Sequence, residues 1–193
     1  MTDVEICRWD ALTEAEQRRL LPDLDHVFFS SSNTQSFESD AEKRAFHTRW
    51  LGRYLLHFPH YVFLARDSAG RAIGYVVGSM ADPARDPIFS DLPFLAAFAE
   101  ASARYPAHLH VNLVEAWRGH GLGARLIATF SDAAQREGAP GVHVVTQRAA
   151  RNVRFYRANG FQECAAVTLG ETELVFLGRD LGRDLGRDLD RRT

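Results

Sequence analysis

A glycine-rich turn between an expected strand and an expected helix is the part of this sequence best suited to bind an anion. Residues 118–124 read Arg-Gly-His-Gly-Leu-Gly-Ala, and the apolar residues at helical spacing are Leu122, Leu126, Ile127 and Phe130. Backbone N–H groups at a helix start have no intrahelical partner and lie at the positive end of the helix dipole. Glycines let the chain come close to a ligand. The turn therefore predicts a pyrophosphate site.

The spacing of the glycines narrows the type of nucleotide. A Rossmann dinucleotide motif requires a third glycine three residues after the second, but Leu126 stands three residues after Gly123. If Gly119 and Gly121 are the first two glycines, Ala124 takes the third place, which is a partial match because alanine is tolerated there. The P-loop pattern of glycine, four residues, glycine and lysine is missing. The spacing therefore disfavours a P-loop and matches a Rossmann motif only in part, but by itself it does not identify the nucleotide.

The strand before this turn carries two histidines that could act as a base. His108, His110 and Asn112 alternate with apolar residues, so they share one face of the strand. An imidazole titrates near neutral pH, which suits general base catalysis. Both histidines could instead satisfy buried backbone groups; of the two, we favour His110 as the base. His120 lies in the glycine turn and is expected to face solvent, and His143 is expected to be structural.

The elements that must position these residues mix strands and helices. Capping boxes at Thr13 and Ser39 predict the starts of two helices, because each is followed three residues later by glutamate. Further helices are expected at 92–104, 122–138 and 152–159, and strands at 4–9, 60–65, 72–79, 108–114, 142–146, 161–169 and 172–177. The strands at 60–65 and 72–79 are expected to form a hairpin. This order predicts a mixed α/β layer arrangement.

Composition limits the class of protein. The 193 residues fit one domain, and a hydrophobic fraction of 46% with 25% charged residues is ordinary for a globular protein. A formal net charge of -2 argues against a nucleic-acid partner. No apolar run approaches the roughly 20 residues that cross a bilayer, and the N-terminus lacks a secretory signal. Cys7 and Cys164 lack metal-ligand spacing, so we expect a cytoplasmic chain with reduced thiols, no metal and no membrane partner.

The end of the chain has low complexity. Gly-Arg-Asp-Leu occurs three times from Gly178 to Leu189. Each glycine costs about 1 kcal/mol relative to alanine in a helix, which disfavours a helical stripe of the leucines. We therefore expect residues 1–177 to form the domain and residues 178–193 to form a tail with little catalytic meaning.

Two motifs together resemble those of the GNAT superfamily of acetyltransferases. The pattern Arg-x-x-Gly-x-Gly at 118–123 resembles the acetyl-CoA motif of that superfamily, and Arg-Phe-Tyr-Arg-Ala-Asn-Gly-Phe at 154–161 resembles its second motif, Tyr-x-x-x-Gly-Phe. The expected element order also matches the GNAT fold. The resemblance implies an α/β fold with a mixed central sheet of about seven strands and helices on both faces. It also implies a V-shaped splay between the fourth and fifth strands, at 108–114 and 142–146.

The resemblance implies that acetyl-CoA is bound as the acetyl donor. Its pantetheine arm would pair with backbone groups of Leu113, Val114 and Glu115. Its pyrophosphate would lie beside Arg118, against N–H groups of the turn. The turn residues implied as binding are Gly119, His120, Gly121, Leu122, Gly123 and Ala124. Recognition of the donor would therefore depend mostly on the main chain.

Tyr156 is implied both as a contact of acetyl-CoA and as the catalytic acid. When an amine attacks the thioester, a CoA thiolate leaves, and a phenol near the sulfur can protonate it. The alternative is a core tyrosine at the end of an amphipathic helix. The family usually has asparagine seven residues before this tyrosine, where this chain has Ala149. Asn152 lies one turn later and could replace that contact or cap its helix.

An amine acceptor also requires a base, since the pKa of an unperturbed lysine is about 10.4. The pair His108 and His110 resembles the paired histidines of aralkylamine acetyltransferases, although the spacing to the glycine turn differs by one residue. The resemblance thus supports the histidines as candidate bases.

A closer resemblance involves residues 107–113, Ala-His-Leu-His-Val-Asn-Leu, and residues 141–143, Gly-Val-His. They resemble the acetyltransferase-like domain of O-GlcNAcases and its free-standing bacterial relatives, some of which are of uncertain catalytic ability. The expected function is acetyl transfer to an amine of a small molecule or peptide by direct attack on the thioester. The alternative is a non-catalytic acetyl-CoA-binding module, and the intact turn disfavours an interaction domain without the donor. No motif identifies the acceptor or the oligomeric state.

Overall fold

The computed structural model describes residues 4–32, 34 and 36–182 and divides into two compact units. The first unit is built from residues up to Gly78 and His110–Phe130, and the second from Ser79–Leu109 and residues from Ser131 onward. Strand β4 (Ala107–Leu113) and helix α5 (Leu122–Arg136) contribute to both. Within the described ranges, no helix is long and apolar enough to cross a membrane.

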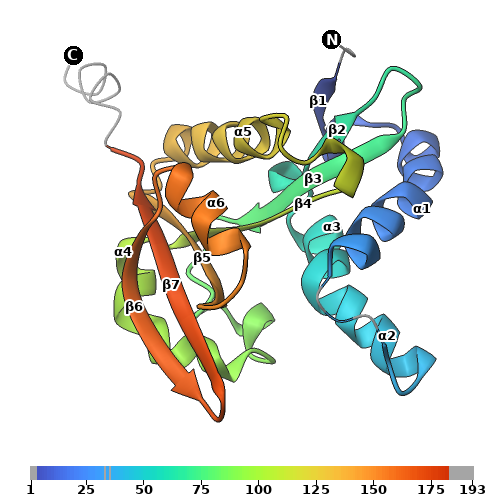
Figure 1. Cartoon of the computed structure of the whole chain (residues 1–193). Coiled ribbons are helices and arrows are strands. Elements are labelled where there is room, and N and C mark those ends of the chain that lie inside the picture. Colours follow the sequence, from blue (N-terminus) through green and yellow to red (C-terminus); the bar gives the residue numbers. More distant parts are fainter. Residues whose placement is uncertain (1–3, 33, 35, 183–193) are drawn as a thin grey trace, which may run out of the picture. The chain divides into compact units, whose positions relative to one another are not determined.

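The first unit combines helices with an antiparallel part of the sheet (Figure 1). Its α-helices and strands, besides parts of β4 and α5, are β1 (Glu5–Arg8), α1 (Glu14–Ser31), α2 (Asp40–His47), α3 (Arg53–His57), β2 (Phe63–Arg66) and β3 (Ala72–Ser79), of which Ser79 belongs to the second unit. Strand β1 pairs antiparallel with β2, and β2 pairs antiparallel with β3. The predicted hairpin is therefore confirmed.

The capping signals read from the sequence mark real helix starts. Thr13 Oγ1 accepts from the Glu16 N–H at 3.3 Å, and the Glu16 carboxylate accepts from the Thr13 N–H at 2.9 Å. At α2, Ser39 Oγ accepts from the Glu42 N–H at 3.1 Å. These bonds supply partners for backbone donors that lack a carbonyl within their own helix. After α2 the helix continues through a π-helical turn, η2 (Thr48–Gly52), into α3.

The second unit contains the rest of the sheet. Besides parts of β4 and α5, its elements are η4 (Pro87–Phe89), η5 (Pro93–Phe98), α4 (Ala99–Arg104), β5 (Gly141–Gln147), α6 (Asn152–Ala158), β6 (Gln162–Leu169) and β7 (Thr172–Asp180). The helix expected at 92–104 is thus a 3₁₀ helix followed by α4, and Leu92 lies at its N-cap. The expected single helix is therefore two shorter ones, and Pro93 lies in the first turn of the 3₁₀ segment.

The strand pairing confirms the mixed sheet. Strand β4 pairs in parallel with β5 at Ala107–Val142 and at His108–His143. Strands β5 and β6 both pair antiparallel with β7. The resulting order in the described residues is β1-β2-β3-β4-β5-β7-β6, a sheet of seven strands. The predicted α/β fold is confirmed, whereas the splay between β4 and β5 involves residues of both units and stays a prediction.

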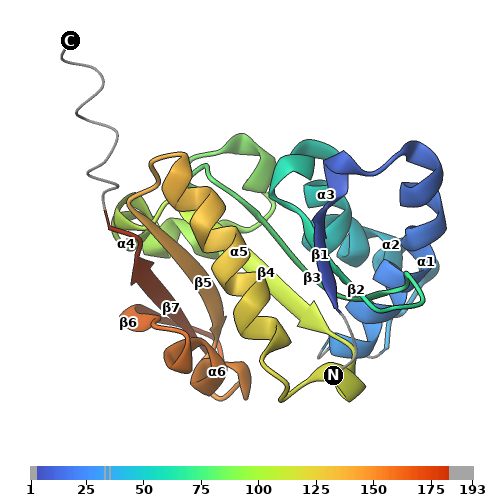
Figure 2. The same ribbon diagram turned by 90° about the horizontal axis from the view of Figure 1, so that it is seen from above.

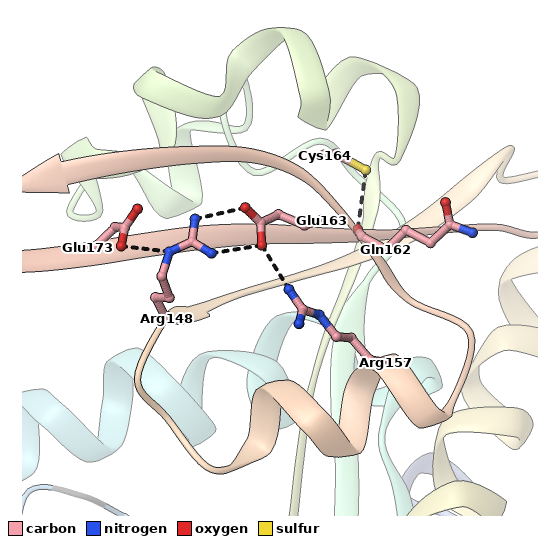
Figure 3. A network of polar contacts seen from close by, with 6 residues as sticks. All are labelled: Arg148, Arg157, Gln162, Glu163, Cys164 and Glu173. Carbon is pink, nitrogen blue, oxygen red and sulfur yellow. Dashed lines mark hydrogen bonds and ion pairs between the residues drawn. The ribbon is translucent and has the colours of Figure 1, made fainter.

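An aromatic core covers one face of the β5–β7–β6 sheet. Phe98, Tyr105 and Phe176 form its buried cluster, with the Phe98 and Phe176 ring centroids 5.7 Å apart. Figure 3 shows the segment that contains α4 on this face and α6 on the opposite face. The second unit therefore has a helix layer on each side of these strands.

Tyr105 lies against two glycines of the sheet. A Cβ atom added to Gly141 would lie 2.4 Å from Cδ1 of the Tyr105 ring, and one added to Gly178 would lie 2.8 Å from its Cδ2. Both distances are shorter than van der Waals contact. Because both strand positions are glycine, the Tyr105 ring can pack directly against the backbone of the two strands.

The chain end differs from the expectation of a separate tail after Leu177. Gly178–Asp180 completes β7 and pairs with β5. The Leu181 N–H then donates to the Pro140 carbonyl oxygen at 3.1 Å. The first Gly-Arg-Asp-Leu copy is thus held in the second unit, because pairing with a distant strand outweighs its low local propensity. Residues 183–193 of the expected tail lie outside the described residues.

Candidate active site

The glycine turn has the backbone conformation that its sequence predicts. Gly119 and Gly121 have φ angles of +80° and +77°, in the left-handed region that favours glycine. A Cβ atom added to either glycine would have no described atom within 4 Å. His120 between them is exposed, as expected. The main chain of the turn is therefore open to a ligand.

Helix α5 starts directly after this turn (Figure 2). Its first intrahelical bond runs from the Arg125 N–H to the Gly121 carbonyl oxygen at 3.1 Å. The N–H groups of Leu122, Gly123 and Ala124 come before that bond, so their own helix offers them no carbonyl. Together with the positive end of the helix dipole, these donors can bind an anion.

The Arg118 side chain connects the turn to strand β4 and helix α1. Its Nε donates to the Leu113 carbonyl oxygen at 3.1 Å, and its Nη2 donates to Ser31 Oγ at 3.4 Å. Ser31 Oγ also donates to the Leu113 carbonyl at 3.0 Å. The exposed guanidinium therefore holds the end of β4 at the start of the turn, where its positive charge favours an anion.

The main chain after β4 already has several partners. The Val114 N–H donates to the Ile73 carbonyl oxygen at 3.0 Å. The carbonyls of Val114 and Glu115 accept from the N–H groups of Trp117 and Arg118, at 3.1 and 3.0 Å. A pantetheine arm that pairs with this segment would therefore use its remaining backbone groups.

His110 lies among aromatic rings of the first unit. Its Nε2 is 3.1 Å from the Tyr54 hydroxyl oxygen. The imidazole is also T-shaped to Trp50, with centroids 5.3 Å apart, and to Tyr54, with centroids 5.5 Å apart. Tyr54 is 1% exposed, whereas His110 is only partly buried. The ring of His110 thus has a defined orientation, as a general base requires.

Asn112 lies two residues further along β4, on the same strand face as His110. Its Nδ2 donates to the Tyr75 hydroxyl oxygen at 2.7 Å. Burial raises the pKa of Tyr75, and the bond from Asn112 opposes that rise. The first unit therefore keeps a neutral phenol beneath this face of β4.

His108 belongs to the second unit and is buried there. Its ring is T-shaped to Phe89 at 4.8 Å and lies 5.7 Å from the ring of His143. His143 Nδ1 donates to the Tyr105 carbonyl oxygen at 2.5 Å, and its ring stacks on Phe176 at 4.3 Å. Burial lowers the pKa of His143 to about 4. This neutral, packed imidazole fits the structural role expected of His143.

Tyr156 lies on α6 and is buried. Its ring is T-shaped to Phe161, with centroids 5.5 Å apart, and tilted to Phe155, with centroids 5.4 Å apart. Burial raises the pKa of the Tyr156 phenol. The hydroxyl therefore keeps its proton at neutral pH and can act as a hydrogen-bond donor.

Asn152 is the first residue of α6, and the N-cap position belongs to Arg151. The side-chain carbonyl of Asn152 accepts from Thr146 Oγ1 at 3.0 Å, which connects α6 to β5. Ala149, where the family usually has asparagine, is exposed. Asn152 is therefore not the cap of its helix, and a contact with the pantetheine arm stays a prediction.

The predicted site residues are distributed over both units. His110 and the cofactor-binding candidates from Leu113 to Ala124 belong to the first unit, and His108, Asn152 and Tyr156 belong to the second. Within the first unit, the strand end, Arg118 and the glycine turn lie together. Contacts across the two units stay predictions.

Two partners of the predicted site residues, Tyr54 and Ser31, are distant from them in the sequence. Tyr54 lies on α3, and its hydroxyl contact with His110 joins residues 56 positions apart. Ser31 is the last residue of α1, and its hydroxyl reaches the Leu113 carbonyl across 82 positions. Neither contact leaves a local pattern in the sequence, so only the fold reveals it.

A comparison with protein families agrees with this fold. The family model described as "Acetyltransferase (GNAT) domain" matches residues 59–163, more than half of the chain. The chain belongs to the GNAT acetyltransferase family.

Solved structures share the fold over nearly the whole chain. SsHAT is 22% identical, with 94% of this chain and 100% of that chain covered at a TM-score of 0.70. A GCN5-related N-acetyltransferase from Kribbella flavida is 17% identical, with 92% and 97% covered at 0.59. The yncA protein of Salmonella typhimurium, solved with its cofactor acetyl-CoA, is 18% identical, with 94% and 96% covered at 0.56. At these identities the likeness shows the fold alone.

Proposed function

We propose that this protein is an N-acetyltransferase that binds acetyl-CoA and transfers its acetyl group to an amine of a small molecule or peptide. The observation that carries the proposal is the glycine turn, with left-handed φ angles and open space at Gly119 and Gly121. Membership of the GNAT family and the acetyl-CoA held by yncA support the choice of donor.

The residues of the turn fit a pyrophosphate. The N–H groups of Gly119–Ala124 would bind its oxygens, and Arg118 would add positive charge beside them. Backbone groups of Leu113–Glu115 would hold the pantetheine arm. Because these contacts use the main chain, they depend on the fold more than on particular side chains. Bound acetyl-CoA supplies an activated thioester.

His110 is the proposed base. An amine must lose a proton to react, and an imidazole accepts protons near neutral pH. His110 is partly exposed and oriented by Tyr54, whereas His108 is buried beside Phe89. A partly exposed imidazole can exchange protons with solvent between turnovers. We therefore assign the base to His110 in preference to His108.

Tyr156 is the proposed acid. Its raised pKa keeps the hydroxyl protonated, so the donor is present throughout the neutral range. The same rise makes complete proton transfer from the phenol less favourable. Hydrogen-bond donation to the departing sulfur is therefore the larger part of the expected effect.

The donor site is tested by a matched pair of glycine substitutions. Gly138, at the end of α5, has a φ of +84° and, like Gly121, no described atom within 4 Å of an added Cβ. Gly121→Ala and Gly138→Ala therefore introduce the same kind of backbone strain. Calorimetry should show at least about tenfold weaker acetyl-CoA binding for Gly121→Ala and wild-type affinity for Gly138→Ala. Equal affinities in both variants would place the donor elsewhere.

Transfer itself is tested with a panel of small amines and peptides. Release of CoA thiol and acetylation of the amine, followed by mass spectrometry, should occur together with at least one acceptor. If the protein binds acetyl-CoA but acetylates no amine, the transferase proposal fails and a non-catalytic acetyl-CoA-binding module is favoured.

A further inference from the structure

One carboxylate in the second unit, that of Glu163, joins two arginines (Figure 3). Arg148 Nη1 and Nη2 donate to its two oxygens at 3.0 and 2.8 Å, and Arg157 Nη2 donates at 3.0 Å. Arg148 Nε also lies 2.6 Å from Glu173 Oε2. The two guanidinium groups and two carboxylates form one network of balanced charge.

The two arginines lie at opposite ends of one chain segment. Arg148 directly follows β5, and Arg157 lies in the last turn of α6. The segment between them carries both Asn152 and Tyr156. The start and the end of this segment are therefore bound to the same carboxylate, that of Glu163.

Helix α6 has little to stabilise it by itself. It has 7 residues and no side-chain bond at its N-cap. An isolated helix of this length is unstable in water. The start of the segment is also held by a main-chain bond from the Arg148 N–H to the Glu173 carbonyl oxygen, at 2.9 Å. Its end is held by the bond from Arg157 to Glu163, together with bonds from Asn159 Nδ2 to the Phe155 carbonyl oxygen at 2.8 Å and from the Phe161 N–H to the Tyr156 carbonyl oxygen at 3.2 Å.

A β-bulge explains how Glu163 reaches α6. The pairing of β6 with β7 shifts between Glu163 and Ala165, so Cys164 is an extra residue in the strand. Ala165 packs on the Phe98–Tyr105–Phe176 cluster, and Cys164 contacts Tyr105 on that same face. In a regular strand, Glu163 and Ala165 would share one face. The bulge instead directs the Glu163 carboxylate to the face that carries α6.

We propose that Glu163 is a positioning residue for acetyl transfer: it holds the segment from Arg148 to Arg157 so that the Tyr156 hydroxyl has one fixed place. The inference rests on the proposed role of Tyr156 as the acid. Glu163 acts through the helix rather than on the substrate. The side chains of the network are 30–54% exposed, so its ion pairs contribute little to global stability. The effect is local to α6.

A double-mutant cycle separates positioning from general stability. Glu163→Ala should lower kcat about tenfold while the KM for acetyl-CoA changes less than about twofold, since a displaced donor slows the reaction step. In a Tyr156→Phe background, Glu163→Ala should change kcat by less than about twofold, because there is no hydroxyl left to position. Glu163→Asp keeps the charge and should restore part of the rate.

Glu173→Ala is the matched control. It removes a carboxylate from the same network but leaves Glu163 joined to both Arg148 and Arg157. Its kcat should stay within about twofold of the wild type. Arg157→Gln, which removes the bond between the end of α6 and Glu163, should behave like Glu163→Ala.

Amide hydrogen exchange gives a readout that does not need an acceptor. In Glu163→Ala, exchange should accelerate in α6 and stay unchanged in β7 and α5. Unchanged exchange in α6 would overturn the proposal. So would an equal loss of kcat in the wild-type and Tyr156→Phe backgrounds. If Tyr156→Phe alone leaves kcat unchanged, the acid role fails first and the positioning role fails with it.

Discussion

His110 and Tyr54 are joined by a hydrogen bond of 3.1 Å between the imidazole Nε2 and the phenol oxygen. Tyr54 lies on α3 and His110 on β4, so the bond connects a helix to the strand that leads into the glycine turn. The bond gives the imidazole a fixed orientation. The orientation of the proposed base therefore depends on a residue 56 positions away in the sequence.

If His110 is the base, the rate of acetyl transfer should increase with pH. With saturating acetyl-CoA, the rate should rise with pH through the titration of an imidazole, because only the neutral ring accepts a proton. His110→Gln should remove this pH dependence and slow the reaction, and Tyr54→Phe should slow it roughly fivefold through loss of one hydrogen bond. The control is His57→Gln, which changes an exposed histidine on α3 and should leave the pH dependence and the rate unchanged. A wild-type pH dependence in His110→Gln would exclude His110 as the base.

Tyr156→Phe should slow acetyl transfer on the order of 10²-fold while the Kd for acetyl-CoA stays within about twofold. Only the hydroxyl is lost, and the buried ring keeps its contacts with Phe161. Turnover and calorimetry measure the two effects. Tyr105→Phe removes a hydroxyl from another buried tyrosine of the second unit and should leave both values unchanged. A normal rate in Tyr156→Phe would reduce Tyr156 to a packing residue.

The lowered pKa of His143 predicts that the protein loses stability in mild acid. Its pKa is lowered to about 4 in the folded protein, against about 6.5 in an unfolded chain. Between these values the unfolded chain binds more protons, so the free energy of unfolding falls as the pH drops from about 6.5 to about 4. The loss is roughly 3 kcal/mol.

Denaturant unfolding of His143→Gln at several pH values checks this prediction. The variant should be less stable at pH 7 because it loses the stacking on Phe176, but its stability should depend less on pH in this range. An unchanged slope in the variant would show that other groups cause the acid sensitivity.

Two truncations test the end of β7. Removal of residues from Gly178 onward deletes the pairing of Gly178–Asp180 with β5 and should lower Tm by roughly 5–10 °C. Removal of residues from 183 onward should leave Tm nearly unchanged. Thermal unfolding followed by circular dichroism measures both. Equal Tm values for the two truncations would mean that the end of β7 adds no stability.

Local signals predicted much of the fold. The capping box of Thr13 and Glu16, the hairpin of β2 and β3, and the glycine turn each depend on residues close in the sequence. Their physics is local, because caps and turns satisfy neighbouring backbone groups. Elements of this kind can be read from one sequence.

The features that escaped prediction depend on distant residues. Gly178 looks like the start of a repeat, yet its strand is completed by pairing with His143. Glu163 gives no sign in the sequence that a bulge at Cys164 turns it toward α6. Side-chain directions at a bulge depend on strand register, which tertiary packing sets. The candidate acid and base were found from motifs, whereas their supporting residues required the structure.

The contact of Tyr105 with two glycines has a consequence for related sequences. A Cβ atom at Gly141 or Gly178 would overlap the Tyr105 ring. The side chains at these three positions therefore fill the same space, and a larger one at either glycine requires a smaller one at position 105. Relatives with a side chain at either glycine position should therefore carry a smaller residue at the tyrosine position. In this chain, Gly178→Ala alone should destabilise the fold, and a second substitution, Tyr105→Leu, should recover part of the loss. Gly178 is also the first residue of the first Gly-Arg-Asp-Leu copy. Covariation at these three positions would show that packing against Tyr105, and not only duplication of the tetrapeptide, requires glycine there.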